Sequence, residues 1–315
     1  MCDGILGFAV GDALGVPVEF FSRSKLDNNP VKDMIGFGTH LVPEGSFSDD
    51  TSMVIATMAS IIETSEINYD NMMCKFYEWL EYGKYSSLDT VFDVGITTKY
   101  SILKFKNGIS PLLCGANDSK SNGNGSLMRM LPIAYYLYKN NYDFEGSVDI
   151  VNHVSSLTHA HEISWLGCKI FCDYVGLILD GVNKIDAVNK LREYDYNSYY
   201  TLDSIDKYRR ILSGDIVNLS RDEIKSSGYV VDTLEASLWS FINSDNYEDA
   251  VLKAINLGGD TDTIGALTGA LSGIVYGRKQ IPKKWLGKLR KREYLENISK
   301  KYLYSIKNDV NNKRR

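Results

Sequence analysis

Several features that would place a chain in a common class of proteins are missing from these 315 residues. The longest apolar stretch, IGALTGALSGIVYG, is shorter than the ~20 residues that a membrane-spanning helix needs. N-myristoylation requires glycine at position 2, which here is Cys2. There are 35 Lys and Arg against 40 Asp and Glu, and the net charge of −5 opposes general attraction to nucleic acid or anionic lipid. We therefore expect no general nucleic-acid binding and no membrane association.

Cysteine is also scarce. The five cysteines are an odd number, and the opening MCDGILGFAV has no basic segment ahead of an apolar one, as a secretory signal would have. Both observations favour a reducing, cytoplasmic setting. Cys168 and Cys172 are spaced to share one helical face, but no second cysteine pair or nearby histidine pair completes a zinc site. We expect them to be buried structural thiols.

Only six prolines occur, and the polar segments between apolar ones are short, so nothing in the chain resembles an interdomain linker. Apolar residues recur at helical spacing, as in Val54, Met58 and Ile61, and few segments alternate with the period of two typical of strands. This pattern predicts a compact, all-α, single domain over residues 1–306, followed by a polar, frayed tail over 307–315. The polar stretch from about 180 to 228 is expected at the periphery.

A cluster of oxygen-bearing side chains stands at a predicted helix start in GSFSDDTSMVIATM. Ser48 is a suitable N-cap, and Asp49 and Asp50 fill the first turn. Acids in a first turn suit the helix dipole, so capping accounts for one carboxylate. Two adjacent acids flanked by hydroxyls also offer the hard oxygen ligands that Mg²⁺ or Mn²⁺ requires.

The same chemistry recurs in LGGDTDTIGALTGALSG, where Asp260, Asp262 and Thr263 follow a Gly-Gly turn and precede an apolar helix. Two such clusters, if they converge, could bind two cations roughly 3.5–4 Å apart. Without a cation, four clustered carboxylates would repel one another and raise their pKa values. The alternative is a helical scaffold in which the acids only cap helices. The glycines and alanines that follow would let this helix pack closely against another backbone.

Two further segments carry candidate chemistry. In GILGFAVGDALGVPVEFF, Pro17 stops or kinks a helix ahead of Glu19, and a carboxylate after a helix break can move; the alternative is a surface glutamate. In SNGNGSLMRMLPIA, Gly123 and Gly125 precede a helix, where backbone N–H groups can approach a diphosphate; the alternative is an ordinary turn.

These pieces, in this order, resemble the ADP-ribosylglycohydrolase family, which includes the dinitrogenase reductase-activating glycohydrolases and the ADP-ribosyl-acceptor hydrolases. The blocks that carry the resemblance cover nearly the whole chain and are GDALGVPVEF, SDDTSM, FDVGITT, GNGSLMRMLPIA, THAHEISWLG, SGYVVDTLEASLW and LGGDTDTIGALTGALSG. The resemblance implies a compact all-α fold with a dinuclear Mg²⁺ or Mn²⁺ site, on which the terminal ribose of ADP-ribose is bound for cleavage of its anomeric bond.

The resemblance also implies roles for particular residues. Glu19 matches a mobile glutamate that activates the attacking water or assists departure of the acceptor, and Asp93 matches an acidic residue important in arginine-directed relatives. The implied metal ligands are Ser48, Asp49, Asp50, Asp260, Asp262 and Thr263, with Ser48 standing where many members have Thr. The implied substrate contacts are Gly95, Ser121, Asn122, Asn124, Gly125, Ser126, His159 and Tyr229.

The resemblance therefore implies a metal-dependent hydrolase that removes mono-ADP-ribose from modified protein. Asp93 favours ADP-ribosyl-arginine as the substrate, and we expect the enzyme to be a monomer. Three alternatives remain open at this point: hydrolysis of O-linked ADP-ribosyl-serine, hydrolysis of a small ADP-ribosylated molecule, and ADP-ribose binding without catalysis.

Overall fold

The computed structural model describes residues 1–306, and this range consists of helices and loops without a strand. The α-helices are α1 (Cys2–Gly15), α2 (Arg23–Asn28), α3 (Asp49–Thr64), α4 (Tyr69–Tyr82), α5 (Ile96–Lys106), α6 (Leu131–Lys139), α7 (Phe144–Ser156), α8 (Glu162–Leu179), α9 (Lys184–Leu191), α10 (Leu202–Lys207), α11 (Arg209–Leu212), α12 (Val230–Ile242), α13 (Tyr247–Ile255), α14 (Thr261–Tyr276), α15 (Lys283–Lys288) and α16 (Arg292–Ser305). The 3₁₀ segments are η1 (Val16–Val18), η2 (Pro111–Leu113), η3 (Leu127–Arg129), η4 (Tyr196–Ser198), η5 (Asp215–Asn218), η6 (Arg221–Glu223) and η7 (Arg278–Gln280). The all-α prediction is confirmed, whereas the predicted tail over 307–315 lies outside the described residues.

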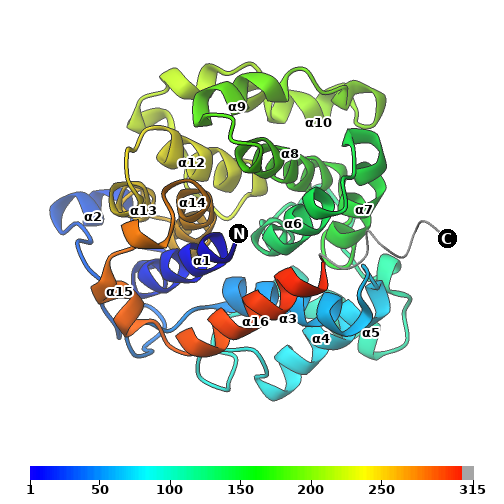
Figure 1. The fold of residues 1–315 in the computed structure, drawn as a ribbon, viewed down its shortest axis with the longest axis horizontal. Coiled ribbons are helices and arrows are strands. Elements are labelled where there is room, and N and C mark those ends of the chain that lie inside the picture. The colour runs from blue at the N-terminus through cyan, green and yellow to red at the C-terminus, as the bar shows by residue number, and fades with distance from the viewer. Residues whose placement is uncertain (307–315) are drawn as a thin grey trace.

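Helices α1 and α14 cross in close contact at the centre of the molecule (Figure 1). A Cβ atom added at Gly7 would lie 2.2 Å from the carbonyl oxygen of Gly269, and one added at Gly11 would lie 2.0 Å from that of Gly265. No side chain fits at these distances, so the glycines allow the two backbones to touch. The predicted close packing of the second acidic helix is confirmed.

The α1–α14 contact decides where the acidic helix starts. The two helices run antiparallel, since Gly4 packs near Ala270 while Gly15 packs against Asp262. The hydroxyl of Thr261 donates to the carbonyl of Gly15 over 2.8 Å. The first turn of α14 therefore lies beside the end of α1, just before the break at Pro17.

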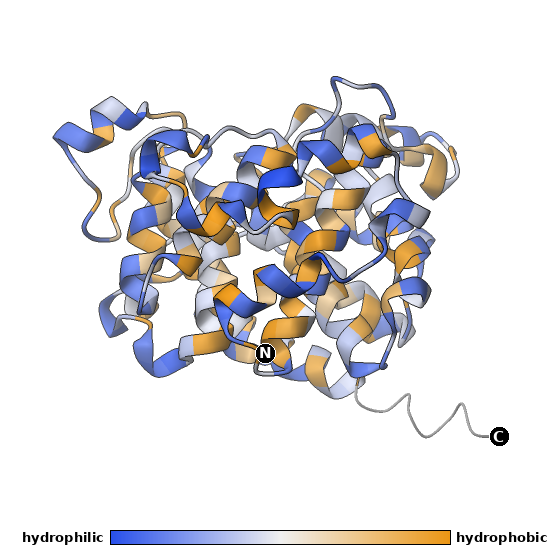
Figure 2. Ribbon diagram, turned by 90° about the horizontal axis from the view of Figure 1, so that it is seen from above, coloured by the Kyte–Doolittle hydropathy of each residue, from blue (hydrophilic) through white to orange (hydrophobic). Residues whose placement is uncertain are grey.

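Apolar faces of the surrounding helices cover this central pair. Val54, Met58 and Ile61 of α3 and Phe76 of α4 are fully buried, as the apolar spacing predicts. Figure 2 shows the hydrophobic residues concentrated inside, with hydrophilic residues on the outer turns. Helices α9 and α10 lie along one edge of the molecule in Figure 1, as expected for residues 180–228.

Other local predictions also hold. Helix α1 ends at Gly15 and is followed by the 3₁₀ turn η1 that contains Pro17. Cys168 and Cys172 are buried, free thiols on α8. Among the described helices, none has the combined length and apolar character needed to cross a bilayer.

Candidate active site

The first turn of α3 presents carboxylates that are not used in capping. Ser48 is the N-cap residue, and its hydroxyl accepts a hydrogen bond from the Asp50 amide over 3.2 Å. The Asp49 carboxylate accepts from the Gly95 amide over 3.4 Å. The Asp50 Oδ1 atom accepts from the Thr263 hydroxyl over 3.3 Å, whereas its Oδ2 is buried and has no hydrogen-bond partner among residues 1–306.

The first turn of α14 faces the first turn of α3. Asp260 is the N-cap residue of α14, but its side chain makes no capping hydrogen bond. One of its carboxylate oxygens accepts from the Asn124 amide over 2.8 Å, and the other is buried without a partner in the described chain. Asp262 is 3% exposed and accepts from the Thr263 amide over 2.9 Å. The predicted convergence of the two acidic clusters is therefore present.

A carboxylate from a third helix, Asp12 of α1, joins these four. Asp12 is fully buried and accepts hydrogen bonds from the amides of Ser48 and Thr51 and from the Thr51 hydroxyl, which lies 2.6 Å away. It therefore ties α1 to the start of α3. Oxygen atoms of Asp12, Asp50 and Asp262 lie within 4.8 Å of one another, and so do those of Glu19, Asp260 and Asp262.

Burial raises the pKa values of four of these acids, Asp12, Asp49, Asp50 and Asp262, and for the last three repulsion by neighbouring carboxylates adds to it. Burial is the main cause for Asp49, Asp50 and Asp262, and their pKa values lie well above the usual range. The pKa of Asp12 is raised to about 6, and hydrogen bonds from Thr51 and Ser48 oppose the rise. So many buried acids within reach of one another form a site that a divalent cation would stabilise.

Glu19 follows η1 and lies at one side of the cluster. Its carboxylate makes a short hydrogen bond with Nε2 of His40, and Asp93 lies within reach of both side chains. Burial raises the pKa of Glu19 to about 7, and the His40 bond opposes this. The His40 ring packs near Phe20 and Phe92, with ring centroids 6.3 and 5.6 Å away. The carboxylate is thereby held beside the cavity by a packed imidazole.

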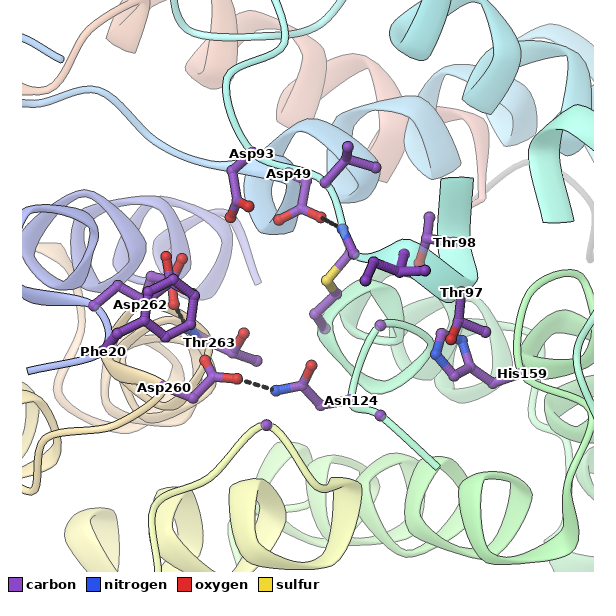
Figure 3. Close-up of a pocket in the computed structure, with 18 residues that line it drawn as sticks. Phe20, Asp49, Asp93, Thr97, Thr98, Asn124, His159, Asp260, Asp262 and Thr263 are labelled. Carbon is purple, nitrogen blue, oxygen red and sulfur yellow. Dashed lines mark hydrogen bonds between the residues drawn. The ribbon is translucent and has the colours of Figure 1, made fainter. Parts of the chain in front are cut away.

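The opposite side of the site is made of backbone and small polar groups. A cavity of about 380 Å³ runs from Phe20, past Asp260 and Asp262, to Asn124 and His159 (Figure 3). The loop that carries Gly123 and Gly125 lies against the His159 ring, so any Cβ at Gly125 would be 2.8 Å from it. This glycine loop leaves room along the backbone for a flat or anionic group.

His159 is held as a neutral ring by its surroundings. It is 2% exposed, and its Nδ1 pairs with the Thr158 hydroxyl over 2.8 Å. Burial, together with the positive charge of Arg129, lowers the pKa of His159 to about 3. Arg129 itself is buried and donates to the carbonyls of Gly125 and Val154 over 2.8 Å each. Arg129 therefore ties the glycine loop to the end of α7 through these two hydrogen bonds.

Comparison with known proteins agrees with this geometry. The family model for ADP-ribosylglycohydrolase matches residues 1–312. The chain belongs to the ADP-ribosylglycohydrolase family. It is 32% identical over 301 residues to the protein named ADP-ribosylarginine hydrolase Tri1 of Serratia proteamaculans, covering 95% of this chain and 78% of that one. It is 28% identical over 296 residues to ADP-ribosyl-[dinitrogen reductase] glycohydrolase of Rhodospirillum rubrum, covering 90% and 88%.

A solved structure has the same fold. The structure titled ADP-ribosylglycohydrolase-related protein complex superimposes with a TM-score of 0.80 and 28% sequence identity, and the match covers 97% of each chain. This ADP-ribosylglycohydrolase is therefore a glycosidase on an all-α fold, and ADP-ribosyl hydrolysis is its general activity.

The structure brings most of the predicted site residues of this ADP-ribosylglycohydrolase to one cavity. Those that line it are Glu19, Asp49, Asp93, Gly95, Asn124, Gly125, His159, Asp260, Asp262 and Thr263. Ser48 and Asp50 lie buried directly behind this lining, in the first turn of α3.

Four predicted substrate contacts lie outside the lining. Ser121 donates to Asp118, and Asn122 is buried with its amide bonded to the Ser119 carbonyl. Ser126 is fully buried beside Ser155. Tyr229 is the N-cap residue of α12 and pairs by a single β-bridge with Gly123. In this structure they shape the glycine loop and do not face the cavity.

Three residues of the ADP-ribosylglycohydrolase site were not predicted. Asp12 had a detectable signal, since it is an acid within an otherwise apolar and small-residue helix. Arg129 is a charged residue inside an apolar segment, which is a weaker signal of the same kind. His40 had none, because a histidine in a loop 21 residues from Glu19 gives no indication of contact.

The raised carboxyl pKa values predict an unusual pH dependence of stability. A carboxyl whose pKa is higher in the folded state stabilises the fold when protonated. Its contribution is complete below the unfolded value of 3.8 for Asp12 or 4.5 for Glu19, and is lost as the pH rises through about 6 and 7, respectively. We therefore expect the melting temperature of the metal-free ADP-ribosylglycohydrolase to fall between pH 5.5 and pH 7.5.

The same protons compete with divalent cations for the carboxylates. We expect Mg²⁺ or Mn²⁺ to raise the melting temperature more at pH 7.5 than at pH 5.5. Differential scanning fluorimetry in chelator and in each metal, at both pH values, measures this difference. A metal-induced shift of equal size at the two pH values would contradict the prediction.

Proposed function

We propose that this ADP-ribosylglycohydrolase removes mono-ADP-ribose from modified arginine side chains of proteins, using two divalent cations, Mg²⁺ or Mn²⁺. The observation that carries the proposal is that two buried carboxylate oxygens, Asp50 Oδ2 and Asp260 Oδ1, have no hydrogen-bond partner within residues 1–306 and belong to a cluster of acids. Buried polar atoms are normally hydrogen-bonded, so unpartnered carboxylate oxygens on two acids that each converge on Asp262 favour a cation site.

The donor set fits such cations. The residues that would hold them are Ser48, Asp49, Asp50, Asp260, Asp262 and Thr263, with Asp12 as an additional candidate. All offer oxygen atoms, the ligands that Mg²⁺ and Mn²⁺ prefer. When bound, the cations would supply positive charge that fixes the ribose hydroxyls and polarises the attacking water.

Glu19 is the residue best suited to move a proton. Hydrolysis places the water oxygen on the anomeric carbon and breaks the bond from that carbon to the arginine nitrogen, which takes up a proton. A carboxyl with a pKa raised to about 7 can accept a proton from water and return it to the departing nitrogen near neutral pH. The neighbouring carboxylates stabilise the positive charge that develops on the ribose.

The two ends of the cavity suit the two halves of the substrate. Backbone groups of the glycine loop and the neutral His159 would receive the diphosphate and nucleoside without bringing a negative charge near them. Asp93, close to Glu19, would receive the guanidinium of the modified arginine. The names of the Tri1 proteins of Serratia proteamaculans and Pseudomonas putida, at 32% and 31% identity, support arginine as the acceptor.

Release of ADP-ribose from two matched peptides would test the proposal. One peptide carries ADP-ribosyl-arginine and the other ADP-ribosyl-serine, each assayed with Mg²⁺, with Mn²⁺ and with chelator. We expect metal-dependent release from the arginine peptide. Faster release from the serine peptide would overturn the arginine assignment, and release from neither would favour a small-molecule substrate or a protein that only binds ADP-ribose.

His40 is expected to position Glu19, because their side chains are hydrogen-bonded and the His40 ring packs near two phenylalanine rings. Replacing His40 with Ala should lower kcat by about 10-fold while leaving KM for ADP-ribosyl-arginine nearly unchanged, as is typical for loss of a supporting hydrogen bond. His40→Gln should recover part of the loss, since an amide can still reach the carboxylate. Steady-state kinetics of the two variants measure this, and an unchanged kcat in His40→Ala would contradict the role.

We further propose that residues 1–306 form one domain, that the enzyme is a cytoplasmic monomer, and that it has no general affinity for nucleic acid or membranes. One continuous hydrophobic core, from Ile5 to Ile306, supports the single domain. The net charge of −5 supports the absence of general nucleic-acid binding.

A further inference from the structure

Three large apolar side chains stand in solvent near Glu19. Phe20, Phe37 and Leu41 are 70%, 68% and 76% exposed. Their φ angles of 64°, 56° and 54° lie in the left-handed region, which non-glycine residues seldom adopt. We call these three residues the acceptor rim. Strained backbone persists only where its surroundings enforce it, and it gathers at binding and catalytic sites.

The acceptor rim is fastened to the segment that carries Glu19. The Thr39 amide donates to the Pro17 carbonyl over 2.9 Å, and the Thr39 hydroxyl donates to the Glu19 carbonyl over 2.7 Å. The Phe37 amide closes the loop by donating to the Val42 carbonyl over 2.7 Å. The loop that carries the exposed Phe37 and Leu41 side chains is therefore held in place by these hydrogen bonds.

An apolar groove adjoins the rim. Its volume is about 390 Å³, and it is lined by Val18, Phe21, Leu26, Pro30, Val31 and Ile35, together with Lys25, Asn29, Lys32 and Asp33. We call it the side groove. Glu19 and Phe20 line the catalytic cavity, whereas Val18 and Phe21 on either side of them line the groove. The two hollows thus share one stretch of chain as a wall.

Phe20 of the rim lines the cavity at the end where the acceptor must be, and the loop that carries Phe37 and Leu41 is hydrogen-bonded to the neighbouring Glu19 carbonyl. Figure 3 shows His159 at one end, Asn124 and Asp260 nearer the middle, and Phe20 together with Asp262 at the other end. With the nucleoside held at the His159 end, the group attached to the ribose extends toward Phe20 and Asp93. A protein that carries that group must pass over the acceptor rim.

We infer that the acceptor rim and the side groove form the docking surface for the modified protein, which seats an apolar side chain next to its ADP-ribosyl-arginine. This inference rests on the proposed arginine hydrolase function and adds a preference among modified proteins. Exposed apolar surface beside a functional site adds affinity for a protein partner when it is buried on association. The catalytic cavity alone would recognise only ADP-ribose and the guanidinium. Free ADP-ribosyl-arginine gains nothing from the rim.

Two peptides that differ only beside the modified residue test the inference. Each carries one ADP-ribosyl-arginine, flanked either by Leu and Phe or by Ser and Gly, and free ADP-ribosyl-arginine serves as the reference. The variant is Phe37→Asn with Leu41→Asn, because asparagine tolerates left-handed backbone and so preserves the loop. The matched control is Leu202→Asn, which removes a side chain with 75% exposure on α10.

For the wild-type enzyme we expect kcat/KM about 10-fold higher for the apolar peptide than for the polar one, a difference that corresponds to the ~1.4 kcal/mol of a tenfold effect. The double variant should lose this preference while hydrolysing free ADP-ribosyl-arginine at the wild-type rate, and Leu202→Asn should keep it. Equal kcat/KM for the two peptides in the wild type, or a preference that survives in the double variant, would overturn the inference.

Peptide binding measured by fluorescence anisotropy separates this inference from the proposed function. If the wild type releases no ADP-ribose from any arginine substrate, the proposed function fails. The docking surface is then judged by the dissociation constants of the two peptides: tighter binding of the apolar peptide that the double variant abolishes supports it, and equal binding overturns it.

Discussion

Replacing Asp262 with Asn is expected to lower kcat/KM for ADP-ribosyl-arginine by about 1000-fold, which corresponds to roughly 4 kcal/mol of lost transition-state stabilisation. Asp262 is the acid shared by both groups of converging oxygens, so one substitution weakens both candidate cation positions. It is buried, and water cannot replace the missing charge. Initial rates of ADP-ribose release with saturating Mn²⁺ or Mg²⁺ measure the loss.

The same substitution should raise the thermal stability of the metal-free protein, although it lowers activity. Without metal, burial raises the pKa of Asp262, and repulsion by Glu19 and Asp50 raises it further. The metal-free Asp262→Asn protein should therefore melt at a higher temperature than metal-free wild type at pH 7.5, and added metal should raise the melting temperature less.

Asp245→Asn, which changes a fully exposed carboxylate, is the matched control and should leave both activity and melting temperature unchanged. An Asp262→Asn enzyme that keeps wild-type activity would contradict the cation site. Reduced activity together with a lower metal-free melting temperature would point instead to a purely structural role for this acid.

Replacing Gly7 with Ala is expected to destabilise the protein by about 3 kcal/mol or more. The new methyl group would lie 2.2 Å from the Gly269 carbonyl oxygen and 3.0 Å from the Tyr247 ring. The obstacle is backbone, so the clash cannot be relieved by rotating a side chain, and α1 and α14 would have to separate. Separation moves the first turn of α14 away from α3 and would remove activity as well.

Gly176→Ala is the matched control for that substitution. Gly176 also lies inside a helix, α8, but nothing lies within 4 Å of its added Cβ. There the change should stabilise the protein by roughly 0.5–1 kcal/mol, because alanine loses less conformational freedom on folding. Urea denaturation midpoints measure both variants. Equal midpoints for Gly7→Ala and wild type would contradict the close backbone contact.

The local parts of this fold were predictable because their causes are local. Apolar spacing gives the helices that contain Val54 and Phe76, since each must bury one face. The N-cap at Ser48 and the break at Pro17 depend only on neighbouring residues. The assignment of the two acidic blocks as metal-ligand blocks came from the resemblance to ADP-ribosylglycohydrolases. Residue spacing within the chain alone does not provide it.

The meeting of the two acidic clusters in space was not predictable from one sequence. Asp50 and Asp262 are separated by more than 200 residues, and what brings them together is the antiparallel contact of α1 with α14, which only glycines permit. Asp12 becomes part of the site because its carboxylate accepts the amides at the start of α3. His40 reaches Glu19 only because Thr39 ties its loop to the chain around Pro17.

The sequence by itself determined which residue types are available, that a helix begins after Ser48 and another breaks ahead of Glu19 at Pro17, and that two acidic clusters stand at helix starts. These properties depend on capping, periodicity and proline geometry within a few residues. The tertiary structure decided which carboxylates share a cavity, that Ser126 and Tyr229 support the glycine loop without lining the cavity, and that the exposed Phe20 lies at one end of the cavity. Those outcomes depend on distances between segments far apart in the chain, and packing in three dimensions sets such distances.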